Sequence, residues 1–202
     1  KFSSIVIAYA GGSLLLTAVF TALVVWVIGL AVPVTASYII CAVIAAPALI
    51  KLGVPDFAAH MFIFYYSILS EVSPPTALSP FAAAALTGGD PYKTTMQAWK
   101  YTLPAFLVPF NFTLHPDGAA LLLKGPPMDI LWTFLTALVG IFALAAGMDG
   151  WMFKRARGYE RVILVAAGLA LVYPSWVYDA VGLGLVGLAV FSQKILRRND
   201  PS

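Results

Sequence analysis

Charge is scarce in this sequence: charged residues make up 10% of its 202 residues, against about 25% in an average soluble domain. Hydrophobic residues make up 61%, and the mean hydropathy is +0.90. Apolar runs over residues 5–28 and 128–148 exceed the roughly 18 residues that indicate a membrane-spanning helix. The composition therefore excludes a soluble domain and predicts an all-α integral membrane protein, built as a multi-span helical bundle.

Residues that carry catalysis or bind transition metals are few and scattered. The one cysteine, Cys41, lies in an apolar run, so we expect a small structural residue with no disulfide or redox role. The two histidines, His60 and His115, are isolated, and no zinc-ligand spacing, haem-ligand pair or Ser/His/Asp set is present. A Walker-type phosphate loop is also lacking. These absences argue against an enzyme, whether intramembrane or ATP-hydrolysing, and no cofactor is expected.

The net charge of +3 does not indicate a nucleic-acid partner. Basic residues are not interleaved with aromatics along a groove; they cluster beside apolar runs, where the positive-inside rule accounts for them. The densest basic stretch, residues 149–161, is therefore predicted to be a cytoplasmic loop. It is followed by an interrupted apolar region and a basic tail, residues 162–202, which we expect to form a helical hairpin returning to the cytoplasmic side.

The first part of the chain, residues 1–28, is predicted to be a spanning helix that leads into a hairpin. Its polar residues Ser13, Thr17 and Thr21 are spaced by four, so they lie on one helical face that packs on a neighbouring helix. No signal peptide is expected, because the first apolar run is too long and lacks a small-residue cleavage site. Because the chain begins at Lys1 and not at a methionine, we expect it to be a piece of a longer polypeptide.

Two clusters of helix-breaking residues interrupt the apolar sequence that follows. Residues 29–35 contain Pro33, and residues 73–76 contain two adjacent prolines. A proline lacks the backbone N–H and clashes with a preceding carbonyl, so each cluster frees carbonyl groups. The first cluster and the short apolar run after it predict a re-entrant helical hairpin over 29–50. Spacing alone leaves open how much of residues 5–28 belongs to the same helix pair. The second predicts a discontinuous helix over 57–87.

The remaining segments are simpler. Residues 92–127 contain an amphipathic, interfacial stretch at 92–101 and an apolar helix bent at its prolines. Residues 128–148 are predicted to be a plain spanning helix. Asp179, near two aromatic residues of the C-terminal hairpin, is interpreted as a residue of the membrane interface.

Helix breaks inside apolar sequence suggest transport. In hydrocarbon an unpaired backbone polar group costs several kcal/mol, so the freed carbonyls need protein partners or a wet cavity that holds a cation. Paired broken segments indicate the binding site of secondary transporters. The alternative is that both clusters are simple proline kinks, in which case the chain is a non-transporting scaffold or assembly subunit.

The sequence resembles the large membrane subunit of tripartite ATP-independent periplasmic (TRAP) transporters over roughly residues 1–125. The segments that carry the resemblance are 29–38 (GLAVPVTASY), 46–49 (APAL), 52–55 (LGVP), 70–78 (SEVSPPTAL) and 89–91 (GDP). The likeness is greatest to the fused small-plus-large type associated with TAXI-class solute-binding proteins. The Glu160-Arg161 start and the stretch from Pro174 to Asp179 resemble the C-terminal extension of that type.

The resemblance implies a sodium-coupled elevator mechanism and one half of an inverted-repeat transporter, so that residues 29–91 form the transport-domain unit. Carbonyls and hydroxyls around the two breaks would coordinate one sodium ion, as the only metal. The residues that this assigns to sodium are Gly29, Pro33, Thr35, Ser73, Pro74 and Thr76. The residues that it assigns to the solute or its cavity are Ser37, Ser70, Glu71 and Pro75.

This sequence departs from the family pattern at two places, at or next to these residues. Ala31 and Val32 stand where Gly-Leu is more usual before the proline, which affects the geometry of the local carbonyls. Ser73 stands where threonine is commoner, and serine keeps the hydroxyl oxygen that sodium binding needs. Glu71 has two interpretations: it adds negative charge near the cation, or it sits in a water-filled vestibule and caps a half-helix.

The resemblance also implies partners and a location. The solute, commonly an organic acid in the family, would be delivered by a periplasmic solute-binding protein. The first hairpin and its sodium site would lie upstream, in the N-terminal half of the permease, next to the small-subunit helices. The expected location is the inner membrane of a bacterium, as a multi-pass protein in the lipid bilayer that imports its solute by symport with sodium.

Overall fold

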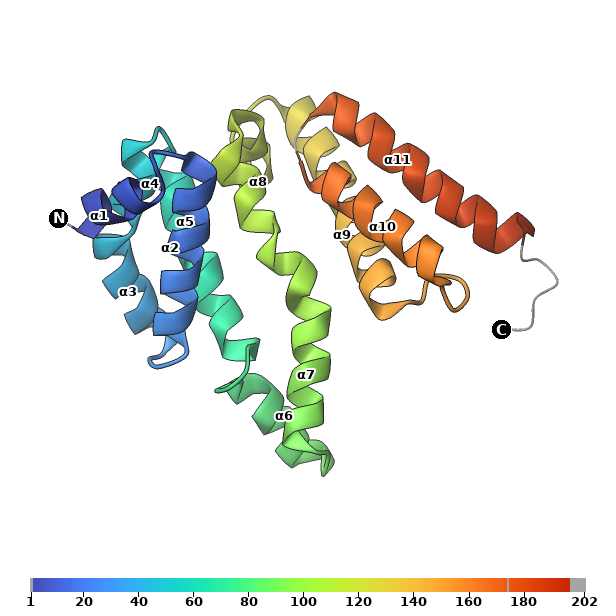
Figure 1. Ribbon diagram of the computed structural model, residues 1–202, viewed down its shortest axis with the longest axis horizontal. Helices are drawn as coiled ribbons and strands as arrows, with labels where there is room; N and C mark the ends of the chain where they lie inside the picture. Colours follow the sequence, from blue (N-terminus) through green and yellow to red (C-terminus); the bar gives the residue numbers. More distant parts are fainter. Residues whose placement is uncertain (1, 174, 197–202) are drawn as a thin grey trace. The chain divides into compact units, whose positions relative to one another are not determined.

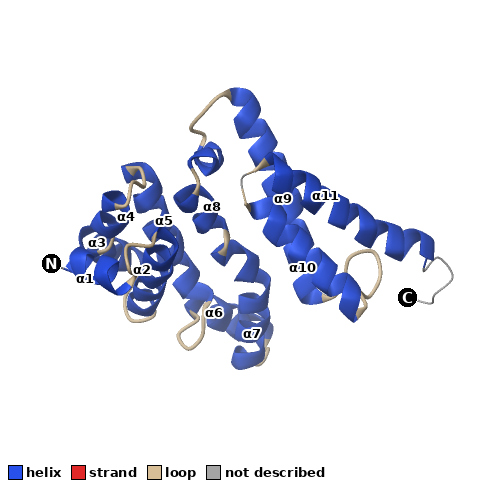
Figure 2. Ribbon diagram, turned by 45° about the horizontal axis from the view of Figure 1, so that its top comes forward, coloured by secondary structure: helices blue, strands red, loops and turns tan. Residues whose placement is uncertain are grey.

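The computed structural model describes residues 2–173 and 175–196, and its contacts divide the chain into two compact units. Unit 1 runs to Pro116 and unit 2 begins at Asp117. Helices dominate both units, as the colouring of Figure 2 shows. Together with the membrane-compatible apolar helices described below, this confirms the prediction of an all-α membrane helical bundle.

Length and composition fit membrane crossing for three helical segments of the described residues, Val34–Lys51, Pro127–Asp149 and Trp176–Lys194. The helices Leu14–Gly29 and Leu78–Thr87 are also apolar but shorter. Short apolar helices are expected where a span is broken or turns back inside the membrane, because each arm then crosses only part of the hydrocarbon.

Unit 1 begins with α1 (Phe2–Tyr9) and α2 (Leu14–Gly29). The segment 1–28, predicted to be a spanning helix, is therefore divided into two helices. Gly11 and Gly12 adopt φ angles of +58° and +76°, which glycine adopts without a steric penalty. Ser13 then starts α2 by accepting a hydrogen bond from the Leu16 N–H with its hydroxyl. Thr17 and Thr21 are buried on α2, as their spacing predicted.

The chain turns after α2 and returns as α3 (Val34–Ile44) and the short α4 (Ala46–Lys51). Pro33 is the residue that precedes α3, where its missing N–H costs nothing. Residues 29–50 thus hold the turn and only one arm of the helical hairpin, because the other arm is α2. The predicted hairpin boundary at residue 29 is wrong for this reason: Gly29 ends the first arm.

Helix α5 (Asp56–Leu69) packs against α2 and α3, and is followed by a single 3₁₀ turn, η1 (Ser70–Val72). The chain then breaks at residues 73–77 and resumes as α6 (Leu78–Thr87). Ala77 starts α6 with a left-handed backbone, φ 38° and ψ 51°, which is uncommon for a non-glycine residue. The Pro74-Pro75 peptide bond is cis. Helices α5 and α6 are the two halves of a discontinuous helix, visible in Figure 1 on either side of the loop at the lower end of α5.

The chain leaves α6 through Gly88 and returns along α7 (Pro91–Thr102), η2 (Leu103–Phe106) and α8 (Val108–Leu114). Asp90 caps α7 by accepting the Lys93 N–H at 2.8 Å. Aromatic rings of α5 and of this return segment form the core of unit 1. Phe62 and Phe110 meet edge to face with ring centroids 5.4 Å apart, and the Tyr66 hydroxyl donates to the Phe106 carbonyl at 2.7 Å.

Unit 2 begins within the 3₁₀ segment η3 (Pro116–Leu122). Its helices α9 (Pro127–Asp149), α10 (Gly158–Val172) and α11 (Trp176–Phe191) pack against one another. Glycines let these helices approach closely, as expected in membranes. A Cβ atom on Gly168 of α10 would lie 2.7 Å from the Gly140 carbonyl oxygen of α9, and one on Gly182 of α11 would lie 3.0 Å from the Ala167 carbonyl oxygen. Pro174, Arg197 and Arg198 of the predicted hairpin and tail lie outside the described residues.

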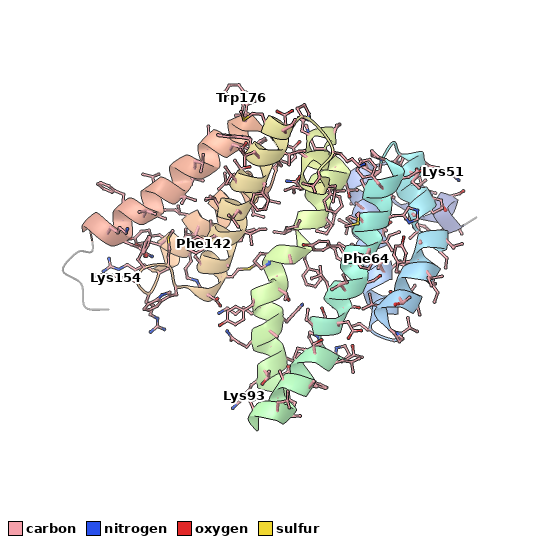
Figure 3. The ribbon with its side chains drawn as sticks, turned by 180° about the vertical axis from the view of Figure 1, so that it is seen from behind. Lys51, Phe64, Lys93, Phe142, Lys154 and Trp176 are labelled. Carbon is pink, nitrogen blue, oxygen red and sulfur yellow. The ribbon has the colours of Figure 1, made fainter. Side chains whose placement is uncertain are left out.

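Asp179 ties α11 to α9 near the end of unit 2 that carries Trp176. The indole N–H of Trp132 donates to Asp179 Oδ2 at 2.8 Å, and Asp179 is only 4% exposed. Figure 3 shows Trp176 at this end, opposite Lys154. The sequence predicted a residue of the membrane–water interface, and it gave no sign that Asp179 is buried between two helices.

We expect Trp132→Phe to destabilise unit 2 by about 2 kcal/mol, because it leaves a buried carboxylate oxygen without its donor. Thermal unfolding of the purified chain in detergent measures the effect. Trp176→Phe is the matched control, since Trp176 is 79% exposed. Equal unfolding temperatures for Trp132→Phe and Trp176→Phe would show that the bond to Asp179 contributes no stability.

Candidate functional site

The C-terminal ends of α2 and α5 meet at Gly29 and Ser70. A Cβ atom built on Gly29 would lie 2.7 Å from Ser70 Cβ, in close contact with Ser70 Oγ, and 3.3 Å from Ser37 Oγ. All three residues are buried. Only a residue without a side chain allows this approach, which explains glycine at position 29. The turn after α2 and the break after α5 lie at the same end of unit 1 in both Figure 1 and Figure 2.

Serine hydroxyls from α3, α5 and η1 surround this contact. Ser70 Oγ donates to the Ser67 carbonyl at 2.6 Å, and Ser67 Oγ donates to the Ile63 carbonyl at 2.9 Å. The hydroxyl oxygens of Ser67 and Ser37 lie 3.3 Å apart. Ser73 Oγ donates to the Leu69 carbonyl at 2.7 Å. Each of the three donating hydroxyls uses its hydrogen on a helix carbonyl, so its oxygen keeps lone pairs for another ligand.

Two backbone carbonyls beside this contact lose their helical donors to proline. In a helix the Gly29 carbonyl would accept from the N–H of residue 33, but Pro33 has none; the Val32 N–H instead bonds the Ile28 carbonyl at 3.3 Å. In a helix the Glu71 carbonyl would accept from the N–H of the third or fourth following residue. These residues are Pro74 and Pro75, and neither has an N–H. Carbonyl oxygens left in this way near two helix C-termini favour a cation, because helix C-termini carry partial negative charge.

The structure does not bring all the predicted residues into one contact set. It brings together Gly29, Ser37 and Ser70. Pro33 and Thr35 are exposed at the turn and at the start of α3. The other predicted residues lie along the break between α5 and α6: Ser73 is buried, Glu71, Pro74 and Thr76 are half-buried, and Pro75 is exposed.

Sequence reasoning missed Ser67, which is fully buried and joins Ser70 to Ser37. A signal was available, because positions 67, 70 and 71 share one helical face and end at the break. It also missed a polar pair on α3 and α5, in which the Tyr38 hydroxyl lies 3.1 Å from His60 Nδ1. That pair requires two helices to pack, so spacing along the chain does not indicate it.

A cavity of about 310 Å³ adjoins the site on the side of α7 and α8. Its walls include Trp26, one turn before Gly29, and Tyr66, one turn before Ser70, together with apolar and aromatic side chains of α2, η2 and α8. No charged side chain lines it. The cavity therefore suits an apolar occupant, and the polar chemistry of this region belongs to the serine-lined contact.

The donors at the site are all oxygens: backbone carbonyls at the two helix ends and serine hydroxyls. Oxygen sets of this kind suit hard cations such as sodium, whereas imidazole and thiolate suit transition metals. Within the part of the chain that the structure describes, no group of three or more histidine, cysteine or acidic side chains is placed to bind a metal ion.

An all-α membrane protein in which a helical hairpin and a discontinuous helix meet at their broken ends has the architecture of a secondary transporter. Comparison with protein families matches residues 1–117 to the family described as "Tripartite ATP-independent periplasmic transporter, DctM component". This match covers more than half of the chain, and the chain belongs to that family. It is a TRAP transporter membrane subunit, a transporter component and not a member of an enzyme family.

A second match covers residues 130–183, described as "Domain of unknown function (DUF3394)". It lies within unit 2, and the first match ends at the boundary between the units. Comparison with curated proteins and with solved structures found no match. The resemblance noted in the sequence is thus confirmed for the TRAP large membrane subunit.

Proposed function

We propose that the chain forms one half of a sodium-coupled TRAP permease of the fused TAXI-associated type. In this proposal it imports a small organic-acid-type solute across the bacterial inner membrane and receives the solute from a periplasmic binding protein. The observation that supports sodium coupling is the convergence of the α2 and α5 C-termini at Gly29 and Ser70, beside carbonyls that Pro33 and Pro75 leave without helical donors.

The proposed cation site uses what these residues offer. The carbonyls of Gly29 and Glu71 and the oxygen of Ser73 supply ligands, and Pro33, Pro74 and Pro75 keep the backbone from closing into helix. Thr35 and Thr76, on the two segments that leave the breaks, would complete the coordination. Ser37 and Ser70, which form the contact with Gly29, would contribute polar groups to the solute site.

We expect Ser73→Ala and Thr35→Ala each to raise the sodium concentration for half-maximal uptake about fivefold, since each removes one oxygen worth about 1 kcal/mol. Uptake by the complete transporter in vesicles, measured against a range of sodium gradients, tests this. Thr87→Ala, which truncates an exposed threonine near the end of α6, is the matched control. Unchanged sodium dependence in both site variants would exclude the assignment.

The scaffold hypothesis makes the opposite prediction about the prolines. If the breaks are only packing kinks, Pro74→Ala/Pro75→Ala leaves uptake intact, because a kink can be replaced by a straight helix with a donor for each carbonyl. If the breaks hold a cation, the same double variant supplies N–H groups that occupy the Glu71 carbonyl and its neighbours, and uptake is lost.

A further inference from the structure

The loop between α9 and α10, residues 150–157, and the end of α11 gather basic side chains at one end of unit 2. Residues 149–161 carry four basic and two acidic side chains, for a net charge of +2. Lys194, in the π-helical turn η4 (Ser192–Leu196) that follows α11, adds a further positive charge. In Figure 3 nitrogen-tipped side chains gather around Lys154 at this end.

The backbone of this loop has a fixed conformation. Trp151 and Arg155 form an isolated antiparallel bridge, and the Ala156 N–H donates to the Gly150 carbonyl at 2.8 Å. Met152 points the other way and packs on the core cluster of α9, α10 and α11, which contains Ala143, Leu164 and Ala189. The loop is therefore anchored in the core at one residue and closed on itself by hydrogen bonds at its ends.

Two fully buried polar side chains hold the loop against the end of α11. Gln193 Oε1 accepts from the N–H groups of Phe153 and Lys154 at 3.2 and 3.3 Å. Glu160 accepts from the Arg157 N–H at 2.8 Å and from the Ser192 hydroxyl at 2.7 Å. The carboxylate of Glu160 is thus buried. Of the basic residues of the loop, Arg155 and Arg157 are exposed and Lys154 is half-buried.

Exposed aromatic rings accompany the basic side chains. Trp151, Phe153 and Tyr159 are 56%, 48% and 50% exposed. Lys194 Nζ lies 4.2 Å from the centre of the Phe153 ring, so a cation and an aromatic face share one surface. Aromatic rings beside lysine and arginine at the end of an apolar helix occupy the depth of lipid headgroups in a bilayer.

We propose that this surface, made by Trp151, Phe153, Arg155 and Lys194, is a binding site for the headgroup of an anionic phospholipid. Its charge is complementary to the phosphate of such a lipid, and basic clusters next to the cytoplasmic end of a membrane helix attract anionic lipids. The positive-inside rule would explain the basic residues here, but it does not require the loop to adopt a defined conformation. The buried bonds to Gln193 and Glu160 impose a defined arrangement, which a specific site requires.

The site gives the segment of unknown function a role that does not depend on sodium coupling: it fastens unit 2 to the anionic leaflet. The test uses the purified full chain in detergent, equilibrated with equal amounts of phosphatidylglycerol and phosphatidylcholine, with retained lipid counted by native mass spectrometry. We expect phosphatidylglycerol to be retained in preference, and Arg155→Gln/Lys194→Gln to lower that preference about tenfold.

The matched control is Lys93→Gln/Lys100→Gln, which removes two basic charges from α7 and leaves this surface intact. The proposal fails if the control lowers the preference as much as Arg155→Gln/Lys194→Gln does, or if neither changes it. Gln193→Leu keeps each basic residue but removes the acceptor that holds the loop, and it should weaken retention as well. A Gln193→Leu protein with wild-type preference would mean that charge alone attracts the lipid, which overturns the built site.

The salt dependence of lipid retention by the wild-type chain tests the proposal without any variant, so it still applies if a variant folds poorly. Because screening weakens contacts between a phosphate and exposed basic groups, phosphatidylglycerol retention must fall as salt is raised. Retention that does not respond to salt contradicts the proposal. Retention of both lipids to the same extent at low salt contradicts it equally.

Discussion

Gly29→Ala is expected to reduce solute uptake by the complete transporter about tenfold or more. The added methyl group would lie 2.7 Å from Ser70 Cβ, and the tips of α2 and α5 must then separate. Overpacking of this size costs about 1–3 kcal/mol, and here it acts on the helix ends whose carbonyls form the proposed cation site. Uptake in vesicles, at saturating sodium and at low sodium, measures the loss and shows whether it falls on sodium affinity.

A second substitution separates crowding from other effects of the alanine. Ser70→Gly removes the atoms that the new methyl group would strike, so Gly29→Ala/Ser70→Gly should recover part of the uptake lost in Gly29→Ala. Coupling of this kind is expected only for residues in direct contact. Gly184→Ala on α11 is the control, because a Cβ there has no neighbour within 4 Å. A double variant no better than Gly29→Ala would contradict the packing explanation.

Glu160→Ala is expected to destabilise unit 2 by about 3 kcal/mol. The substitution leaves the buried donors of Ser192 and Gln193, and the part-buried N–H of Arg157, without their acceptor. An unsatisfied buried donor costs about 1–3 kcal/mol. In a chain of this length the unfolding temperature should fall by about 6–12 °C. Thermal unfolding in detergent, followed by circular dichroism, measures it.

Asp129→Ala is the control for Glu160→Ala. Asp129 is also an acid in the first turn of a helix, but it is exposed. If the two substitutions lower the unfolding temperature equally, the effect of Glu160 comes from its charge near a helix N-terminus and not from the buried hydrogen bonds. Glu160→Gln should fall between Glu160→Ala and the wild type, because an amide keeps one acceptor oxygen and loses the charge.

The helix breaks at Pro33 and at Pro74-Pro75 were predictable because proline acts locally. Its missing N–H and fixed φ act on its own neighbours whatever the rest of the chain does. The break at Gly11 and Gly12 was not predicted, since glycine is frequent in membrane helices and does not require a turn there. For the same reason, the sequence predicted that the hairpin starts at Gly29. In the structure the hairpin begins with α2, which ends at Gly29.

The contacts that define the candidate site were beyond prediction from spacing. Gly29 and Ser70 are far apart in sequence and meet only because α2 and α5 pack side by side with their C-termini at the same level. Ser67 gains its position from the same packing. Unit 2 shows the same limit. Glu160 was visible as one of two acids in the basic stretch 149–161. Its burial depends on Ser192 and Gln193, which lie beyond the rest of α10 and the whole of α11.

The prolines at positions 33 and 75 set thermal stability against transport activity. Each keeps its break open by what it lacks, an N–H group that would otherwise close one more turn of helix. Many other residues at these positions would supply that group and raise local helix stability. Selection for a more heat-resistant protein would therefore tend to close the breaks and lose the proposed site, a trade-off that is common where function needs an incomplete structure. These two positions are the ones to leave untouched when the protein is stabilised for study.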